Sequence, residues 1–371
     1  MAERRDSIDL LRGAVMVLMA LDHARDFFHF GPSPTDHAET TPALFATRWI
    51  THFCAPVFVF LAGVGTSLQL ARGSTKGELS RWLLGRGLWL VFLELTWMHL
   101  AWTLDFRFEF RLNLVQVLWA IGWSMVVLAG LVHLPTWAVG GIALAMIAGH
   151  NAFDGVHNDR WWWYVLHEEG RIRLGGGRSL FVSYPLVPWI GVMAAGYALG
   201  PHLSRRVLLA LGAGAVALFV ALRLPNLYGD PRPWSPQSSP LFTVFSFVNC
   251  EKYPPSLLYL LMTLGPAMLA LAALDRVRAS PRNPLLVFGR VPLFFYLVHL
   301  HLIVLAAIAC HYAKVGDALF EIDPRDLPPD FGFPLWAAYL AAAGVVLALY
   351  PACRWYGRLK AARPRSLLRF V

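Results

Sequence analysis

The sequence predicts an all-α polytopic membrane protein with about ten transmembrane helices. Hydrophobic residues make up 57% of the 371-residue chain, and charged residues make up only 15%. A soluble domain carries about 25% charged residues, so this chain has too little charge to cover a surface that faces water. Apolar stretches of roughly 20 residues, the length of helix that crosses a bilayer, recur along the whole chain. These observations exclude a set of soluble domains and a disordered chain.

The apolar stretches define the predicted helices, and their count ranges from nine to eleven because the fifth is short and the ninth is long. Neither an internal repeat nor a long linker divides them, so residues 1–371 are expected to form a single transmembrane domain. The four cysteines are widely separated and form no CxxC motif, which predicts neither a zinc site nor a disulfide framework. The stretches lie near 8–28, 47–71, 79–104, 110–132, 135–150, 183–201, 205–223, 253–274, 284–312 and 333–354.

The first stretch is expected to remain as a helix rather than to be removed as a signal peptide. It contains Asp9 and Arg12, ends in Asp22 and His23, and has no small-x-small cleavage site.

The loop charges predict an orientation with both termini in the cytoplasm. With ten spans, basic residues fall on the cytoplasmic side and most acids on the other, as the positive-inside rule requires. The formal net charge of +9 is therefore a topology signal and an attraction to anionic lipid rather than a nucleic-acid footprint. The cytoplasmic basic residues are Arg4, Arg5, Arg72, Lys76, Arg81, Arg205, Arg206, Arg276, Arg278, Arg282 and those of the tail after residue 353.

Two segments on the predicted outer side are long enough to have a function of their own. Residues 151–182 contain the aromatic run from Trp161 to Tyr164, which indicates a place at the lipid headgroups or, alternatively, a sugar-binding surface. Residues 224–252 are rich in Pro, Ser and Asn.

Ionisable residues concentrate in the first predicted helix, where charge is unfavourable and indicates function. Arg12 and His23 are eleven residues apart, which returns to within about 20° of the same face and gives a rise of about 16 Å. Asp9 lies one turn from Arg12 and Asp26 one turn from His23, so each has a carboxylate on the same stripe. An alternative interpretation is that Asp9 and Arg12 form an interfacial ion pair and that the His23 side chain snorkels to the lipid headgroups.

Further polar residues lie in or beside other stretches: His52, Arg86, Glu94, His99, Lys252, Arg290, His299 and His301. Each could be a satisfied interhelical hydrogen-bonding group, but together they predict a polar interior. His299 and His301 are two residues apart and point to different sides of a helix, so a shared metal is not expected.

Six segments resemble the bacterial branch of the heparan-α-glucosaminide N-acetyltransferase catalytic-domain family, which belongs to the transmembrane acyltransferases. They are SIDLLRG (7–13), MALDH (19–23), PVFVFLAG (56–63), YPLVPWIG (184–191), KYPPS (252–256) and NPLLVFGRVP (283–292). The resemblance implies an acetyl-CoA-dependent acyltransferase in the bacterial inner (cytoplasmic) membrane. It also implies lipid, acyl-CoA and a carbohydrate or amino-sugar acceptor as partners, and an oligomer is compatible with it.

The expected reaction moves an acetyl group from cytoplasmic acetyl-CoA, a co-substrate, to a hydroxyl or amine at the outer face. His23 is the first candidate for catalysis, followed by His29, with Asp26 or Asp22 holding the imidazole tautomer. In the lysosomal member the catalytic His lies in the loop after the first helix, so His37 is also a candidate.

The remaining site residues fall into two predicted groups. Arg12, Arg86 and Arg290, with Asp9 beside Arg12, are expected at the coenzyme phosphates. The acceptor is expected to meet His52, Glu94, His99, Lys252 and His299, and no metal is expected.

The alternative functions are a transporter or flippase for a polar or lipid-linked substrate and a haem or quinone protein that pairs His23 with His52.

Overall fold

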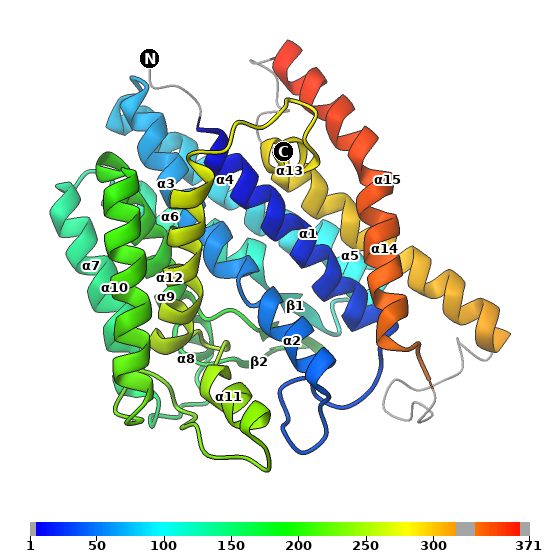
Figure 1. Ribbon diagram of the computed structural model, residues 1–371. Coiled ribbons are helices and arrows are strands. Elements are labelled where there is room, and N and C mark those ends of the chain that lie inside the picture. Colours follow the sequence, from blue (N-terminus) through cyan, green and yellow to red (C-terminus); the bar gives the residue numbers. More distant parts are fainter. Residues whose placement is uncertain (1–4, 317–330, 364–371) are drawn as a thin grey trace. The chain divides into compact units, whose positions relative to one another are not determined.

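A computed structural model describes residues 5–316 and 331–363, and it divides the chain into two compact units. Unit 1 consists of residues 1–7 and 55–277, and unit 2 of residues 8–54 and 278–371. The described chain is mostly helical, as the composition predicts, and Figure 1 shows its elements. The single-domain interpretation of the sequence stays a prediction.

Unit 2 brings the first helices together with the last ones. Its elements are α1 (Asp6–Phe28), α2 (Pro42–Thr51), α13 (Pro284–Arg290), α14 (Pro292–Val315) and α15 (Leu335–Ala362). α2 begins after Thr41, whose hydroxyl accepts a hydrogen bond from the Leu44 amide, and Pro42 occupies the first helical position, where a missing N–H does no harm. α15 packs against both α13 and α14.

The ninth apolar stretch, expected as one helix over 284–312, consists of two helices. Val291 separates α13 from α14, with φ −132° and ψ 50°. Pro292 follows it, and the residue before a proline is pushed out of the α region by the proline ring.

A glycine on each of α1 and α13 lets the two helices touch along their backbones. A Cβ added to Gly13 would lie 1.9 Å from the Leu285 carbonyl oxygen, and one added to Gly289 would lie 1.8 Å from that of Asp9. Such distances are possible only for a residue without a side chain. This contact fixes the position of α1 against α13.

Unit 1 holds the middle helices, which pack pairwise. α10 packs against α12, α4 against α6, and α9 against both α6 and α7. The helices are α3 (Cys54–Ala71), α4 (Lys76–Leu93), α5 (His99–Thr103), α6 (Val117–Leu131), α7 (Thr136–Gly149), α8 (Trp161–Leu166), α9 (Leu186–Leu199), α10 (Arg205–Arg223), α11 (Pro240–Val248) and α12 (Leu257–Leu274).

A small sheet in unit 1 corrects the all-α expectation. The strands β1 (Asn113–Val115), β2 (Gly170–Gly175) and β3 (Arg178–Val182) lie in the order β1-β3-β2. β1 runs parallel to β3, and β2 runs antiparallel to it. The apolar stretch at 110–132 therefore begins as a strand, and its helix α6 starts only at Val117, because β1 forms its hydrogen bonds with a segment 67 residues away.

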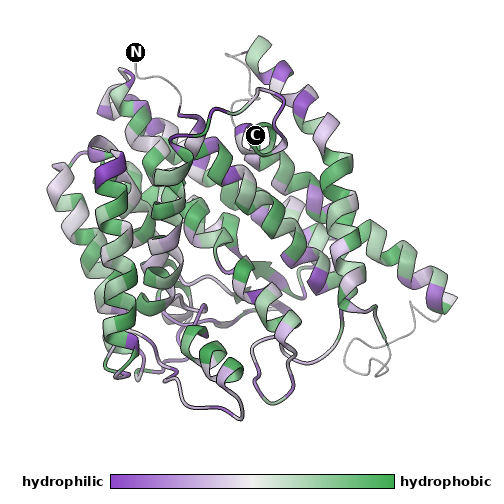
Figure 2. Cartoon of the chain, in the orientation of Figure 1, coloured by the Kyte–Doolittle hydropathy of each residue, from purple (hydrophilic) through white to green (hydrophobic). Residues whose placement is uncertain are grey.

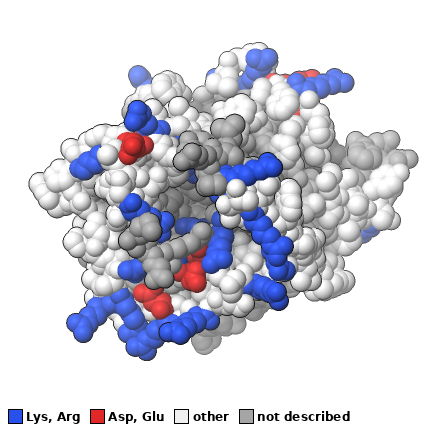
Figure 3. Space-filling model, turned by 90° about the horizontal axis from the view of Figure 1, so that it is seen from above, with Lys and Arg blue, Asp and Glu red and all other residues white. Residues whose placement is uncertain are grey.

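Five helical segments of the described chain are long and apolar enough to cross a membrane, which fits a membrane-embedded protein. They are Pro42–Ala71, Arg205–Arg223, Leu257–Leu274, Pro292–Val315 and Leu335–Ala362. Figure 2 shows hydrophobic residues along these helices and hydrophilic ones in many of the connections between them. The face seen in Figure 3 displays more Lys and Arg than Asp and Glu side chains. The larger span count stays a prediction.

Candidate active site

Two buried histidines of unit 2 form a direct pair. His23 on α1 and His299 on α14 lie with the His23 Nδ1 atom 2.8 Å from the His299 Nε2 atom. His299 is fully buried, and 9% of His23 is exposed. The Phe295 and Tyr296 rings flank the pair, with centroids 5.3 and 5.5 Å from that of His299. The structure thus places His299, an expected acceptor residue, on the expected catalytic histidine.

The backbone around His299 determines which nitrogen of each imidazole carries the proton. The His299 Nδ1 atom lies 2.7 Å from the Tyr296 carbonyl oxygen and 3.1 Å from that of Phe295. Because both oxygens can only accept, Nδ1 of His299 carries the hydrogen, and in a neutral ring its Nε2 is an acceptor. His23 then donates from Nδ1, which leaves the proton-accepting lone pair of His23 on Nε2.

The carboxylates beside His23 bind arginines. Asp22 accepts hydrogen bonds from Arg48 at 2.9 and 3.0 Å and from the Thr51 hydroxyl at 2.8 Å, and Arg25 lies 3.0 Å away. Asp26 pairs with Arg25. Asp22 thereby joins α1 to α2, whereas the predicted tautomer-holding position, Nδ1 of His23, is filled by His299.

The other candidate histidines of unit 2 lie apart from this pair along the chain. The His29 Nδ1 atom lies 3.0 Å from the Phe333 carbonyl oxygen, just beyond the end of α1. His37 packs its ring 5.7 Å from that of Phe45. His52 is buried and follows the last residue of α2.

Two of the three arginines expected at the coenzyme meet around one carboxylate. Arg12 Nη1 lies 3.2 Å from Asp9 Oδ1 and donates to the Gly289 carbonyl oxygen at 3.2 Å. Arg290 Nε lies 3.9 Å from the other Asp9 oxygen. The third, Arg86, lies in unit 1 with its guanidinium 5.7 Å from the Trp82 ring centre.

Glu94 and His99 lie at an irregular turn of unit 1. Residues Glu94–Met98 form a π-helical turn between α4 and α5, a distortion often found at functional sites. The fully buried Glu94 carboxylate accepts a hydrogen bond from the backbone N–H of Gln116 at 2.6 Å. His99 Nε2 lies 3.2 Å from the Asp105 carboxylate. His99 and one Glu94 oxygen therefore have partners within unit 1, while the second Glu94 oxygen, Oε2, is buried without a hydrogen bond among the described residues.

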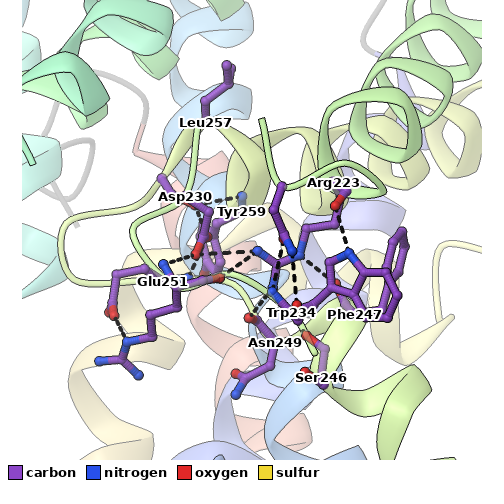
Figure 4. Close-up of polar contacts among 12 residues, drawn as sticks. Arg223, Asp230, Trp234, Ser246, Phe247, Asn249, Glu251, Leu257 and Tyr259 are labelled. Carbon is purple, nitrogen blue, oxygen red and sulfur yellow. Dashed lines mark hydrogen bonds and ion pairs between the residues drawn. The ribbon is translucent and has the colours of Figure 1, made fainter. Parts of the chain in front are cut away.

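A buried arginine that the sequence did not single out organises the segment after α10. The side chain of Arg223, 1% exposed, lies 3.6 Å from the equally buried Asp230 carboxylate. Figure 4 shows its guanidinium surrounded by backbone oxygens. It donates to the carbonyl oxygens of Phe247, Arg232, Ser246 and Asn249.

The same network includes Glu251, the residue that precedes Lys252. Asp230 accepts from the Glu251 amide at 2.9 Å, and the Glu251 carboxylate pairs with Arg232 at 2.6 Å. Lys252 is 93% buried, since 7% of it is exposed, and its ammonium lies 4.9 Å from the Tyr253 ring centre. The neighbouring carboxylates are thus bound to arginines, while the Lys252 ammonium faces an aromatic ring.

A hydrogen-bonded group joins the segment after α7 to the start of α12. Asn151 accepts from the Leu257 amide and donates to Asp154, both at 2.9 Å. Burial raises the pKa of Asp154, and burial lowers the pKa of the nearby His167, against the opposing charge of Asp154. Among the described residues, no group of three or more His, Cys, Asp and Glu side chains could hold a metal ion.

Comparison with known families decides the class of protein. Residues 4–229, more than half of the chain, match the family described as heparan-α-glucosaminide N-acetyltransferase, catalytic. The chain belongs to this family. A search of curated proteins finds no match.

Membership of the heparan-α-glucosaminide N-acetyltransferase catalytic family indicates a membrane acyltransferase, and an acyltransferase needs an acyl donor and an acceptor. The matched region contains Arg12 and His23 and ends before Lys252, Arg290 and His299. The pairing of His299 with His23 is therefore an observation of the structure alone.

Proposed function

We propose that the protein transfers an acetyl group from cytoplasmic acetyl-CoA to a hydroxyl or amine of a sugar at the outer face of a bacterial inner membrane. The proposal includes ten spans with both termini in the cytoplasm. The family supplies the reaction class, and the hydrogen-bonded pair of His23 and His299 carries the assignment of the reacting group.

The histidine pair is suited to general base catalysis. An ordinary imidazole titrates near pH 6.5, so it can take and return a proton at neutral pH. His299 directs the lone pair of His23 to Nε2, and this atom accepts the proton of the acceptor hydroxyl or amine. The acceptor oxygen or nitrogen attacks the thioester carbonyl, the carbon–sulfur bond breaks, and the proton on Nε2 passes to the departing sulfur to give coenzyme A.

The other end of α1 offers a place for the coenzyme phosphates. Arg12 and Arg290 share Asp9, so the three groups together keep a formal charge of +1. Arg290 is the more accessible of the two arginines, with 34% of its side chain exposed, and its guanidinium can bind a phosphate with two hydrogen bonds. The helix rise from Arg12 to His23 is about 16 Å, comparable with the length of a pantetheine arm.

The remaining predicted roles belong to the acceptor and to positioning. We assign Lys252 to the acceptor, because the residue is buried, its ammonium lies against the Tyr253 ring, and the carboxylate of the preceding residue, Glu251, already binds Arg232. Asp22, joined to Arg48 and Thr51, positions the His23 turn of α1 against α2.

The test is acetyl transfer by the purified full-length chain in detergent, with radiolabelled acetyl-CoA as donor and glucosamine and glucose as amine and hydroxyl acceptors. The His23→Ala variant is expected to lose at least about 100-fold in turnover, the usual contribution of a general base. It is expected to elute from a size-exclusion column at the same volume as the wild type. Wild-type turnover by His23→Ala, or its loss in His29→Ala instead, contradicts the assignment of His23. A wild-type protein that neither binds nor consumes acetyl-CoA contradicts the proposed function.

A further inference from the structure

A hollow on unit 1 lies outside the residues of the candidate active site. Its volume is about 780 Å³, large enough for a small polar ligand. The walls come from α8 and from β2 of the small sheet, which contact each other. The lining residues are Asp159, Arg160, Trp161, Trp162, Tyr164, Arg171, Ile172 and Arg173.

The hollow carries an excess of positive charge. Three arginines and a single aspartate line it, and the Tyr164 hydroxyl donates to that aspartate, Asp159, at 2.9 Å. Arg171 and Arg173 are two residues apart on β2, so they point to the same face of the strand. In the described part of the chain neither they nor Arg160 form an ion pair with a carboxylate. A guanidinium group without a carboxylate is suited to a phosphate, which it binds with two hydrogen bonds.

The hollow lies in segments that follow α7, whose last turn contacts the segment just after the candidate membrane span α10. α8 comes shortly after α7, and the Tyr228 hydroxyl, just beyond the candidate span α10, donates to the Ala148 carbonyl oxygen at the end of α7 at 2.5 Å. Trp161 and Trp162 on the rim are 64% and 37% exposed. Exposed tryptophans at the ends of membrane helices lie at the level of the lipid headgroups.

The arginines also need an explanation in terms of topology. Residues 151–182 fall on the predicted outer side, where the positive-inside rule disfavours a cluster of basic residues. Arg160, Arg171 and Arg173 are all exposed, and so they make no contribution to a buried core. A ligand with negative charge in the outer leaflet accounts for them.

We propose that this hollow binds the phosphodiester headgroup of an anionic phospholipid. Arg171 and Arg173 bind the phosphate, and the indole rings of Trp161 and Trp162 lie against the glycerol and the first acyl carbons. The inference rests on the ten-span topology proposed above, but not on the acetyl transfer.

The test is native mass spectrometry of the delipidated, full-length protein titrated with dioleoyl phosphatidylglycerol or dioleoyl phosphatidylcholine. The wild type is expected to bind phosphatidylglycerol at least about tenfold more tightly, and Arg171→Ala/Arg173→Ala is expected to lose that preference, because each lost charge-assisted hydrogen bond weakens binding about tenfold or more. Arg178→Ala is the matched control, since Arg178 is an exposed arginine on the neighbouring strand that does not line the hollow.

Three results would overturn the proposal. They are equal affinity for the two lipids in the wild type, an unchanged preference in the double variant, and a preference lost equally in Arg178→Ala. Two competition arms identify the source of the anion. Glycerol phosphate that binds as tightly as phosphatidylglycerol, or an acidic oligosaccharide that displaces the lipid at lower concentration, shows that the hollow is not a lipid site.

Discussion

Replacing His299 is the sharpest test of the histidine pair, because two substitutions separate its hydrogen bond from its bulk. His299→Phe keeps a ring of similar shape but offers no acceptor to His23, whose Nδ1 atom lies 2.8 Å from His299 Nε2 in the wild type. In a fully buried position, an unsatisfied donor costs about 1–3 kcal/mol. Since 1.4 kcal/mol corresponds to a factor of ten, acetyl transfer is expected to fall about 5- to 150-fold. His299→Gln provides an amide oxygen for His23 and an N–H for the Tyr296 carbonyl oxygen, so it is expected to stay within about tenfold of the wild type.

The assay is single-turnover transfer from radiolabelled acetyl-CoA between pH 5.5 and 8.5, normalised to monodisperse protein. A phenylalanine at position 299 leaves either nitrogen of His23 able to carry the proton, so the shape of the pH–rate profile is expected to change as well as its height. His301→Ala is the matched control, because His301 lies on the same helix and binds the Leu297 carbonyl oxygen instead. Equal rates and equal pH profiles for wild type and His299→Phe would refute the reasoning, and so would a folded His299→Gln protein as slow as His299→Phe.

Three further predictions concern stability and can be measured as melting temperatures in detergent. Arg223→Ala leaves the buried Asp230 carboxylate without its cation and is expected to destabilise unit 1 by about 3–5 kcal/mol. Arg223→Lys should recover only part of this stability, because an ammonium cannot reach all the carbonyl oxygens that the guanidinium binds. Equal stability of Arg223→Lys and the wild type would contradict this role of the guanidinium. Gly289→Ala places a methyl group 1.8 Å from the Asp9 carbonyl oxygen and is expected to lower the melting temperature and the acetyl-transfer rate together, whereas Gly141→Ala, where nothing lies within 4 Å, should change neither. Burial lowers the pKa of His167 in the folded protein, so the unfolded chain binds a proton at a higher pH than the folded chain does. The stability that this group provides is therefore present above about pH 6.5 and is lost as the pH falls below it. The melting temperature of His167→Gln should fall less between pH 7.5 and 5.5 than that of the wild type.

The helices could be predicted where an apolar stretch continues without interruption. The stretch at 205–223 coincides with α10, whose bounds are Arg205–Arg223. The prediction is wrong where pairing with a distant segment competes with hydropathy. Residues 113–115 are apolar enough for a helix, but they pair with β3, a segment far away in the sequence. The break at Val291 could have been expected, since the proline after it disfavours the helical conformation.

The site could be predicted only as far as one helix determines it. The spacing of Arg12 and His23 on α1 follows from helix geometry. The structure shows both residues on one continuous helix, where Arg12 contacts α13 and His23 contacts α14. The partner of His23 could not be predicted, because His299 is 276 residues away and nothing in the local pattern distinguishes it from His301. Arg223 was missed for another reason: as the last residue of an apolar stretch it looks like an ordinary helix end, and its acceptors are backbone carbonyl groups, which leave no trace in a sequence.

Two contacts determine how α1 lies against the C-terminal helices of unit 2, and together they explain why the histidines meet. Gly289 touches Asp9, and His299 touches His23. In ideal helix geometry the first helix rises about 21 Å between its two contact points, whereas the segment from Gly289 to His299 would rise only about 15 Å. The chain between these two points is not one helix, because it leaves the helical conformation at Val291, where α13 ends and α14 begins. The glycine contact and the histidine pair are therefore made by two different helices, α13 and α14, and the break at Val291 lets each of them meet α1 at its own point.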